Sequence, residues 1–210
     1  MRLFEKPADY DAFFRCVAHA HMAIPMRVIS IVLMPNHFHA VLWPRQDADL
    51  SEFMRLMTVT HTQRWHAHHH TAGTGPVYQG RFKSFPIQRD EHLLTVLRYL
   101  DRNPLRAKRV NRAELWQHGS LWLGRQAEPP AWLLPESKWP LKRSADWLTW
   151  INTPQTPKEE AELQVCIKRG RPYGSPQWVS RTATTLNLKS TLRPRGRPVK
   201  TTRNKDSRPF

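Results

Sequence analysis

The stretch that decides the fold is Met34-Pro35-Asn36-His37-Phe38-His39-Ala40-Val41-Leu42-Trp43. Apolar residues alternate with other side chains after a Pro-Asn turn signal, which predicts a strand beginning at His37. Side chains at i and i+2 on a strand point to the same face, so His37 and His39 can reach one metal ion. The alternation places Phe38, Ala40 and Leu42 on the core face and the two histidines on an open face of the sheet.

His-x-His by itself is a weak signal in a chain with 11 histidines. The pattern also occurs at His19 and His21, in a stretch with helical periodicity, where i and i+2 do not share a face. It occurs twice more within residues 66–70, a polar run that we interpret as a helix end entering a solvated loop. Only His37 and His39 lie in a segment whose alternating pattern predicts a strand. By spacing alone, a metal site and two ordinary exposed histidines both stay open.

Residues 90–103 form a second informative element. They begin with Asp-Glu and repeat apolar residues at positions 93, 94, 97 and 100, which predicts an amphipathic helix. At about 100° per residue, Tyr99, Asn103 and His92 cluster on one flank of this helix. Two simpler interpretations stay open here. Tyr99 could be a boundary aromatic with its hydroxyl in water, and Asn103, which precedes Pro104, could be a helix stop.

The remaining periodicity completes an α+β pattern. We expect helices over residues 8–22 and 50–66, an apolar strand over residues 26–34, and a strand or bent hairpin over residues 75–87 with a bulge at Gly80. This order predicts a ferredoxin-like α+β domain, with one antiparallel sheet and helices on one face. The other face would then be open for DNA.

Composition supports one domain with extensions. A chain of 210 residues with 40% hydrophobic residues can bury one sizeable core. Residues 113–167 are rich in Trp and Pro and are typical of an extended segment packed on that core. Cys16 and Cys166 lie far apart without metal-ligand spacing, which disfavours a disulfide framework and indicates a reducing compartment. We find no secretory segment and no apolar run near the roughly 20 residues that span a bilayer.

The net charge of +16 indicates a polyanionic partner, for which nucleic acid is the natural choice. Residues 168–210 contain twelve Lys and Arg and one acidic residue, so we expect the surface that binds this partner to lie mainly in the C-terminal part of the chain. Two Arg-Gly-Arg-Pro boxes, at 169–172 and 195–198, can lie in the narrow minor groove of A·T-rich DNA. Between them, residues 176–192 predict a short helical unit, part of which resembles half of a helix-turn-helix. A solvated tail is the alternative.

Taken together, these residues resemble the active site of the single-tyrosine HUH transposases, specifically the REP-associated tyrosine transposases. The resemblance covers nearly the whole chain. Its landmarks are Leu3-Phe4, Asp9-Tyr10, residues 34–39, Gln79-Gly80-Arg81-Phe82-Lys83-Ser84, Arg98-Tyr99, Asn103-Pro104, Arg106-Ala107 and the two Arg-Gly-Arg-Pro boxes. It implies a catalytic domain over residues 1–112, a connecting segment over 113–167 and a basic DNA-binding tail over 168–210.

There is one departure from the family pattern. Family members usually begin with a His-Val strand and an Arg-Gly turn before the Leu-Phe landmark, whereas this chain starts at Met1-Arg2-Leu3-Phe4. We therefore expect one strand of the sheet to be missing, either because the start codon was placed too late or because the copy is truncated.

The resemblance implies metal-dependent cleavage and joining of single-stranded DNA at palindromic repeats that fold as hairpins. Tyr99 would be the nucleophile and form a 5′-phosphotyrosine, and His37, His39 and Asn103 would hold Mg²⁺ or Mn²⁺. The residues expected to contact DNA phosphates are Arg81, Lys83, Arg98, Arg102, Arg169, Arg171, Arg195 and Arg197. For the first four, solvated surface charges are the equal alternative. The resemblance also implies a bacterial cytoplasmic, nucleoid-associated protein without a membrane partner, and it leaves a homodimer open.

Three other classes of function stay open. One is a domesticated or truncated DNA-binding regulator that does not cleave. Another is an RNA-binding protein that reads hairpins by shape. The last is a metal-dependent hydrolase that uses water, which is disfavoured because no carboxylate accompanies the histidine pair. A covalent adduct with single-stranded DNA separates the transposase interpretation from all three.

Overall fold

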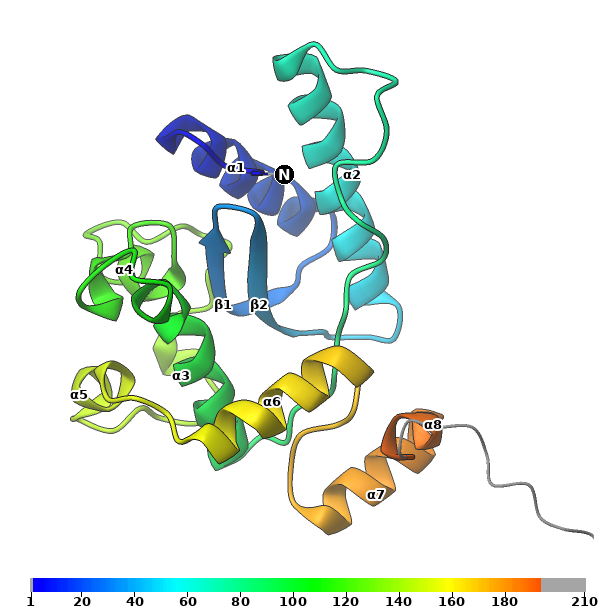
Figure 1. Ribbon diagram of the computed structural model, residues 1–210, viewed down its shortest axis with the longest axis vertical. Coiled ribbons are helices and arrows are strands. Elements are labelled where there is room, and N and C mark those ends of the chain that lie inside the picture. The colour runs from blue at the N-terminus through cyan, green and yellow to red at the C-terminus, as the bar shows by residue number, and fades with distance from the viewer. Residues whose placement is uncertain (1, 194–210) are drawn as a thin grey trace, which may run out of the picture.

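The computed structural model describes residues 2–193, and the structural statements below refer to this part of the chain. An antiparallel hairpin of two strands, β1 (Arg27–Met34) and β2 (His37–Trp43), lies between the helices (Figure 1). Met34 pairs with His37 across the Pro-Asn turn, and Arg27 pairs with Trp43 at the far end. The predicted histidine strand and its turn are therefore confirmed.

The helices account for most of the regular structure. In chain order they are α1 (Pro7–Ala23), α2 (Asp49–His69), α3 (Glu91–Arg106), α4 (Ser120–Leu123), α5 (Trp147–Asn152), α6 (Pro157–Arg169), α7 (Pro176–Thr185) and α8 (Lys189–Leu192), with short 3-10 turns η1 (Ala113–Leu115) and η2 (Glu136–Lys138). The α+β class is confirmed. The helices predicted over residues 8–22, 50–66 and 90–103 are all present, each with ends shifted by a few residues.

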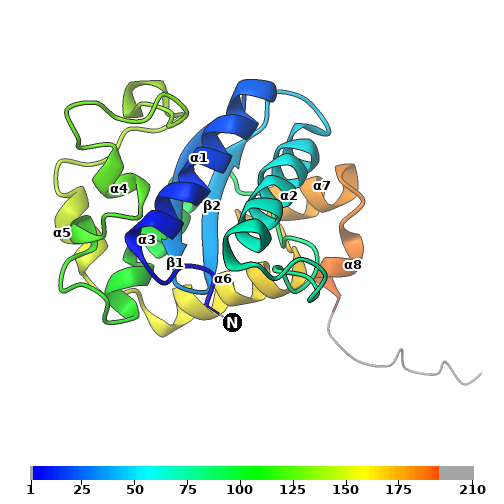
Figure 2. The same ribbon diagram turned by 90° about the horizontal axis from the view of Figure 1, so that it is seen from above.

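Helices cover both faces of the hairpin. On one face, side chains of α1 and α2 pack with β1 around Phe13 and Ile31. On the other face, α3 packs around Val32 and Leu97. Figure 2 shows α1 and α2 side by side in front of the strands. The prediction of helices on one face of the sheet, with the other face open for DNA, is therefore wrong. The reason is that β1 is apolar without alternation, and such a strand is buried on both sides.

The Trp- and Pro-rich segment packs against this domain. Along β1, Leu33 N–H donates to His118 C=O (2.9 Å), and Leu134 N–H donates to Val28 C=O (2.8 Å). The same segment contributes Trp147 and other buried side chains to the core beside α3. Residues far apart in the sequence therefore share one core with the hairpin.

The segment between α2 and α3 is irregular, so the strand or bent hairpin predicted over residues 75–87 is wrong. Val77 is buried in the core, Gly80 has a φ of 103°, and Ile87 makes a single parallel bridge to Tyr173. A regular ladder does not form because prolines bracket the segment and cannot donate a backbone hydrogen bond.

The basic C-terminal part contains two helices as far as it is described. α7 and α8 are joined by a turn in which Asn187 has a φ of 55°, so the helical unit predicted over residues 176–192 is confirmed. Cys16 and Cys166 are free and buried, in agreement with the expectation of no disulfide. None of the described helices is both long and hydrophobic enough to cross a membrane.

Candidate functional site

Helix α3 carries the predicted nucleophile. Its N-terminus is capped by Asp90, whose carboxylate accepts from the backbone N–H of His92 (3.0 Å). The helix continues through Pro104 to Arg106, so the interpretation of Asn103 as a helix stop is wrong. Asn103 Nδ2 donates to the backbone carbonyl of Tyr99 (3.1 Å) and both side chains lie on one flank, as the periodicity predicts.

One cleft of about 350 Å³ collects the predicted metal ligands and the nucleophile. Its lining comes from the end of β1, from β2, from α3 and the residue after it, and from α6, and consists of Met34, His37, His39, Tyr99, Asn103, Arg106, Ala107, Gln164 and Ile167. The ring centroids of His37 and His39 are 4.9 Å apart, and those of His39 and Tyr99 are 6.0 Å apart. The structure thus brings together residues from two elements that the sequence analysis singled out separately.

The environment keeps both histidines neutral. Burial, followed by the charges of His37 and Arg106, lowers the pKa of His39 to about 4. Burial and the charge of Arg106 also lower the pKa of His37. His37 Nδ1 lies 2.8 Å from Asn36 Oδ1, and donation of its proton to that oxygen leaves Nε2 with a free lone pair. Two neutral imidazoles on one strand face fit a divalent metal ion.

The third predicted ligand, Asn103, already makes hydrogen bonds within the protein. Asn103 is 4% exposed, and its Oδ1 accepts a hydrogen bond from Arg106 Nη2 (3.1 Å). An amide oxygen has two lone pairs, so Oδ1 can keep this hydrogen bond and offer its second lone pair to a metal ion. Within residues 2–193, no other His, Cys, Asp or Glu forms a cluster of three with the histidine pair. The donor set therefore fits a metal through the two imidazoles first and through the Asn103 oxygen second.

Tyr99 is not a boundary aromatic with its hydroxyl in water. It is 4% exposed, and its Oη accepts hydrogen bonds from Gln164 Nε2 (2.8 Å) and Arg106 Nη2 (3.2 Å). The Arg106 guanidinium also lies over the Tyr99 ring, 4.9 Å from its centroid. The sequence analysis missed both partners. Arg106 follows Asn103 by three positions on the same helix face and could have been found by periodicity, whereas Gln164 has no local signal.

Two arginines predicted to hold DNA phosphates lie elsewhere. Arg98 is 5% exposed and donates to the carbonyls of Thr153 and Pro154, and Arg102 donates to those of Ile151 and Asn152. They are one turn apart on the α3 face that contacts the end of α5; Arg102 binds the last two carbonyls of that helix, and Arg98 binds the two carbonyls that follow it. In this structure both side chains are engaged in packing rather than facing the cleft.

The other predicted phosphate ligands lie on the surface or outside the described residues. Arg81 and Lys83 are exposed in the irregular segment before α3, and Arg171 is exposed after α6. Arg169 is half-buried at the end of α6 and donates to the carbonyl of Arg193. Arg195 and Arg197, in the second Arg-Gly-Arg-Pro box, lie outside the part of the chain that the structure describes.

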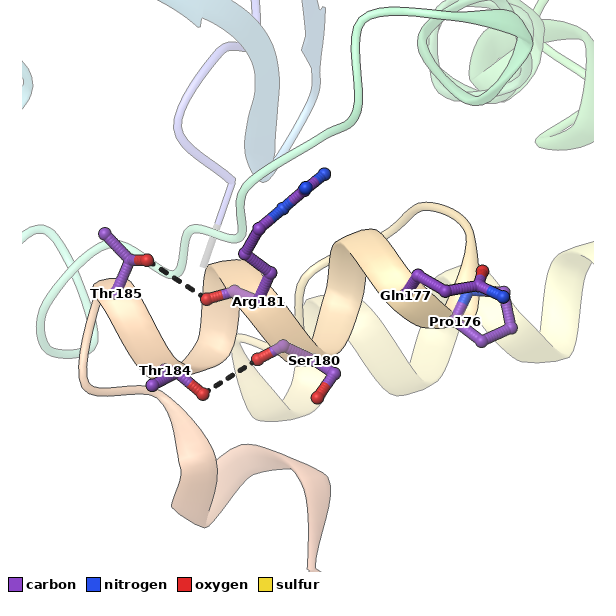
Figure 3. Close-up of a pocket in the computed structure, with 6 residues that line it drawn as sticks. All are labelled: Pro176, Gln177, Ser180, Arg181, Thr184 and Thr185. Atoms are coloured by element: carbon purple, nitrogen blue, oxygen red, sulfur yellow. Dashed lines mark hydrogen bonds between the residues drawn. The ribbon is translucent and has the colours of Figure 1, made fainter.

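A larger and more open hollow, of about 570 Å³, lies on α7. Figure 3 shows its lining, which consists of Pro176, Gln177, Ser180, Arg181, Thr184 and Thr185. The Thr184 and Thr185 hydroxyls donate to carbonyls one turn back, at 3.0 and 3.1 Å. The lining contains a cation and hydroxyls but no carboxylate, imidazole or thiol. It therefore suits contacts to phosphate rather than bond-breaking chemistry.

Comparison with known proteins points in the same direction. Residues 2–103, just under half of the chain, match the model of a family described as "Transposase IS200 like". The matched region includes His37, His39, Tyr99 and Asn103 and ends before Arg106 and α6. No curated protein and no solved structure gives a significant match. The match supports a transposase family, and with it a DNA-cleaving enzyme of DNA transposition whose partner is DNA.

Proposed function

We propose that the protein is a metal-dependent single-stranded DNA endonuclease and strand transferase, of the REP-associated tyrosine type, that acts on hairpin-forming palindromic repeats. The observation that carries the proposal is the shared cleft of His37, His39, Tyr99 and Asn103, in which a buried tyrosine and two imidazoles of lowered pKa line the same cavity. Single exposed histidines or a lone helical tyrosine would not converge in this way.

The proposed reaction is a transesterification. Tyr99 Oη attacks the phosphorus of a DNA phosphodiester, a P–O bond to tyrosine forms, and the P–O3′ bond breaks. The DNA then carries a 5′-phosphotyrosine on one side and a 3′-hydroxyl on the other, and the proton lost by the phenol ends on that 3′ oxygen. Because one phosphodiester is exchanged for another, joining by the reverse step needs no ATP.

His37, His39 and Asn103 would hold Mg²⁺ or Mn²⁺. When bound, such an ion supplies Lewis-acid stabilisation of the charge that develops on the attacked phosphate. The chain's own groups do the rest. Burial keeps the imidazoles unprotonated and ready to coordinate, and Arg106 places a positive charge at the attacking oxygen, 3.2 Å away.

The test of the proposal is a covalent adduct. The full-length protein is incubated with Mn²⁺ and single-stranded hairpin oligonucleotides taken from repeats that flank its gene. We expect a protein–DNA band that survives denaturation and is lost on Tyr99→Phe, while hairpin binding persists. An adduct that maps to Tyr10, Tyr78 or Tyr173 would refute the assignment of the nucleophile.

The basic C-terminal part is proposed to bind the same DNA. Between Glu162 and Asp206 the sequence has no acidic residue, and the described portion presents Arg171, Arg181 and Lys189 to solvent. Replacing these three by Gln should lower the slope of log affinity against log salt by two to three ion equivalents, roughly one per phosphate contact. An unchanged slope would show that these charges are solvated and do not touch DNA.

A second function, a DNA-binding regulator that does not cleave, is favoured by one observation. Asn103 Oδ1 accepts a hydrogen bond from Arg106, and Tyr99 is 4% exposed beneath α6, so both groups are hydrogen-bonded within the protein in this conformation. This alternative predicts tight hairpin binding with no adduct in Mg²⁺ or Mn²⁺. The adduct assay and a binding assay on the same oligonucleotides separate the two functions.

A further inference from the structure

Helix α6 belongs to the C-terminal half of the chain, yet it reaches the proposed nucleophile. Figure 1 shows α6 crossing the ends of the two strands next to α3. Gln164 and Ile167 of α6 line the cleft, and Gln164 Nε2 lies 2.8 Å from Tyr99 Oη. This contact joins residues that are 65 positions apart, and Gln164 lies outside residues 2–103 that match the transposase family.

The position of α6 is well determined by its own interactions. Its N-terminus has a capping box between Thr156 and Glu159, with Pro157 in the first turn. Leu163, the neighbour of Gln164, is 1% exposed and lies in the core beside α3. A helix anchored at its cap and by a core side chain holds the Gln164 carboxamide at a fixed place above Tyr99.

Ion pairs between α6 and α3 add to this anchoring. Glu159 lies 3.7 Å from Arg98, whose side chain is 6% exposed, and Glu160 lies 3.7 Å from Arg106. The second pair is half exposed and contributes little energy by itself. Its geometric effect matters more here, since it orients the same guanidinium that donates to Tyr99 Oη.

The phenol oxygen thus accepts hydrogen bonds from two donors that belong to different helices. Arg106 comes from the helix of the tyrosine itself, and Gln164 comes from α6. Two hydrogen bonds to one oxygen restrict rotation about the Cα–Cβ and Cβ–Cγ bonds of Tyr99, and so fix the direction from which Oη can approach a phosphorus atom. Such restriction of the attacking atom is what an in-line displacement requires.

We propose that Gln164 is a positioning residue for Tyr99, so that α6 completes the cleavage site from outside the family-matched region. The inference rests on the proposed function, because it assigns Gln164 a role in the attack by Tyr99. It goes beyond that function because Gln164 lies outside residues 2–103, so the family-matched region alone cannot form this contact.

The test compares Gln164→Met with Val165→Ala in the full-length protein. Methionine keeps the length and bulk of glutamine but cannot donate a hydrogen bond. Val165 is the adjacent, 41% exposed residue of the same helix and does not line the cleft, so its variant is the matched control. Three quantities are measured: the single-turnover rate of adduct formation at saturating hairpin DNA, the Kd for that DNA, and the Tm.

We expect Gln164→Met to lower the saturated rate about 10- to 100-fold with an unchanged Kd and Tm, and Val165→Ala to change none of the three. Arg106→Met should also lower the rate. The double variant should lose less than the product of the two single losses, because both side chains act on one oxygen. A merely structural role of Gln164 would lower Tm instead and leave the saturated rate intact.

Two outcomes overturn the inference. A Gln164→Met protein that forms the adduct at the wild-type rate or faster would show that the Gln164 hydrogen bond does not aid attack, while the proposed function itself would stand. A wild-type protein that binds the hairpin but forms no adduct would overturn both the proposed function and the positioning role.

Discussion

Two histidine–tyrosine pairs, each with one buried and one partly buried member, lie on opposite faces of the same hairpin. On the face of α1 and α2, the Tyr78 hydroxyl meets His61 Nδ1 at 2.7 Å. On the face of α3, the rings of Tyr99 and His39 lie 6.0 Å apart, and the Tyr99 oxygen is bonded to Arg106 and Gln164 instead. Burial lowers the pKa of both histidines to about 4. The two pairs are thus alike in residue types and in the lowered pKa of the histidine.

The difference lies in what the polar atoms face. The pair of His61 and Tyr78 is enclosed by Phe4, Phe13 and Phe38, and the two side chains satisfy each other. The pair of His39 and Tyr99 borders a cleft that also holds a second imidazole, an amide and a guanidinium. Mutual satisfaction is typical of a structural pair, whereas convergence of several unpaired or exchangeable groups on a cavity is typical of a functional site.

The strongest test of the difference between the two pairs is to remove each tyrosine hydroxyl in turn. Tyr99→Phe should abolish the DNA adduct, a loss of at least about 10³-fold, because the nucleophile is gone. Tyr78→Phe should still form the adduct at close to the wild-type rate. Both proteins are assayed with the same hairpin oligonucleotide under denaturing conditions. Loss of the adduct in Tyr78→Phe but not in Tyr99→Phe would reverse the assignment of the two pairs.

Substitution of the histidines should distinguish the two pairs in the same way, by its effect on cleavage. His37→Ala and His39→Ala are each expected to lower cleavage by more than about 100-fold, since loss of a direct metal ligand exceeds the effect of losing a supporting partner. Asn103→Ala should cost less, because a neutral amide oxygen is the poorer ligand. Mn²⁺ should raise the Tm of the wild type but not of His39→Ala.

Two control variants accompany this experiment. His68→Ala changes the exposed run at the end of α2 and should leave cleavage and the response to Mn²⁺ unchanged. His61→Phe should lower Tm yet retain the rise on addition of Mn²⁺. Equal loss of the Mn²⁺ response in His68→Ala would place the metal in the histidine run of residues 66–70 instead of in the cleft.

Acid should lower the free energy of unfolding of the protein through His61, the histidine of the structural pair. The pKa of His61 is about 4 in the folded protein and 6.5 ordinarily, so between these values the unfolded chain binds the extra proton. Stability is therefore full above about pH 6.5 and falls toward pH 4, by about 3 kcal/mol for this group. Urea unfolding at pH 7, 5.5 and 4.5 measures the slope. His61→Phe should make the slope shallower by the share of this group, while His39 keeps its own share, and an unchanged slope would contradict the assigned protonation.

The smallest expected effect is on stability at neutral pH. Tyr78→Phe leaves His61 Nδ1 buried without a partner, which should lower the free energy of unfolding by about 1–2 kcal/mol. Tyr99→Phe should cost less, because Arg106 keeps its bond to Asn103 and can reach water from the cleft. Urea unfolding at pH 7.5 compares the two variants. A larger loss for Tyr99→Phe would indicate that its hydrogen bonds mainly stabilise the fold.

Local patterns in the sequence were sufficient for much of the site. Alternation placed His37 and His39 on one strand face, and the 3.6-residue period placed Tyr99 and Asn103 on one helix flank. Both are short-range consequences of backbone geometry, which any strand or helix obeys. The same reasoning failed at residues 75–87, where prolines and contacts to Tyr173 replace a regular strand. It did not foresee that Arg98 and Arg102 donate hydrogen bonds to carbonyls at and just after the end of α5, and their contact with DNA stays a prediction.

The sequence by itself determined the hairpin, the first three helices, the helical unit of α7 and α8, the α+β class and the basic C-terminal charge, because each depends on neighbours within a few positions. Only the tertiary structure decided which residues meet. In the folded chain, helices cover both faces of the hairpin, and the Tyr78 hydroxyl hydrogen-bonds to His61. Gln164, 65 positions away in the sequence, hydrogen-bonds to Tyr99. Such long-range contacts follow from burial of apolar faces of separate helices, and no local period encodes which partner a buried face will find.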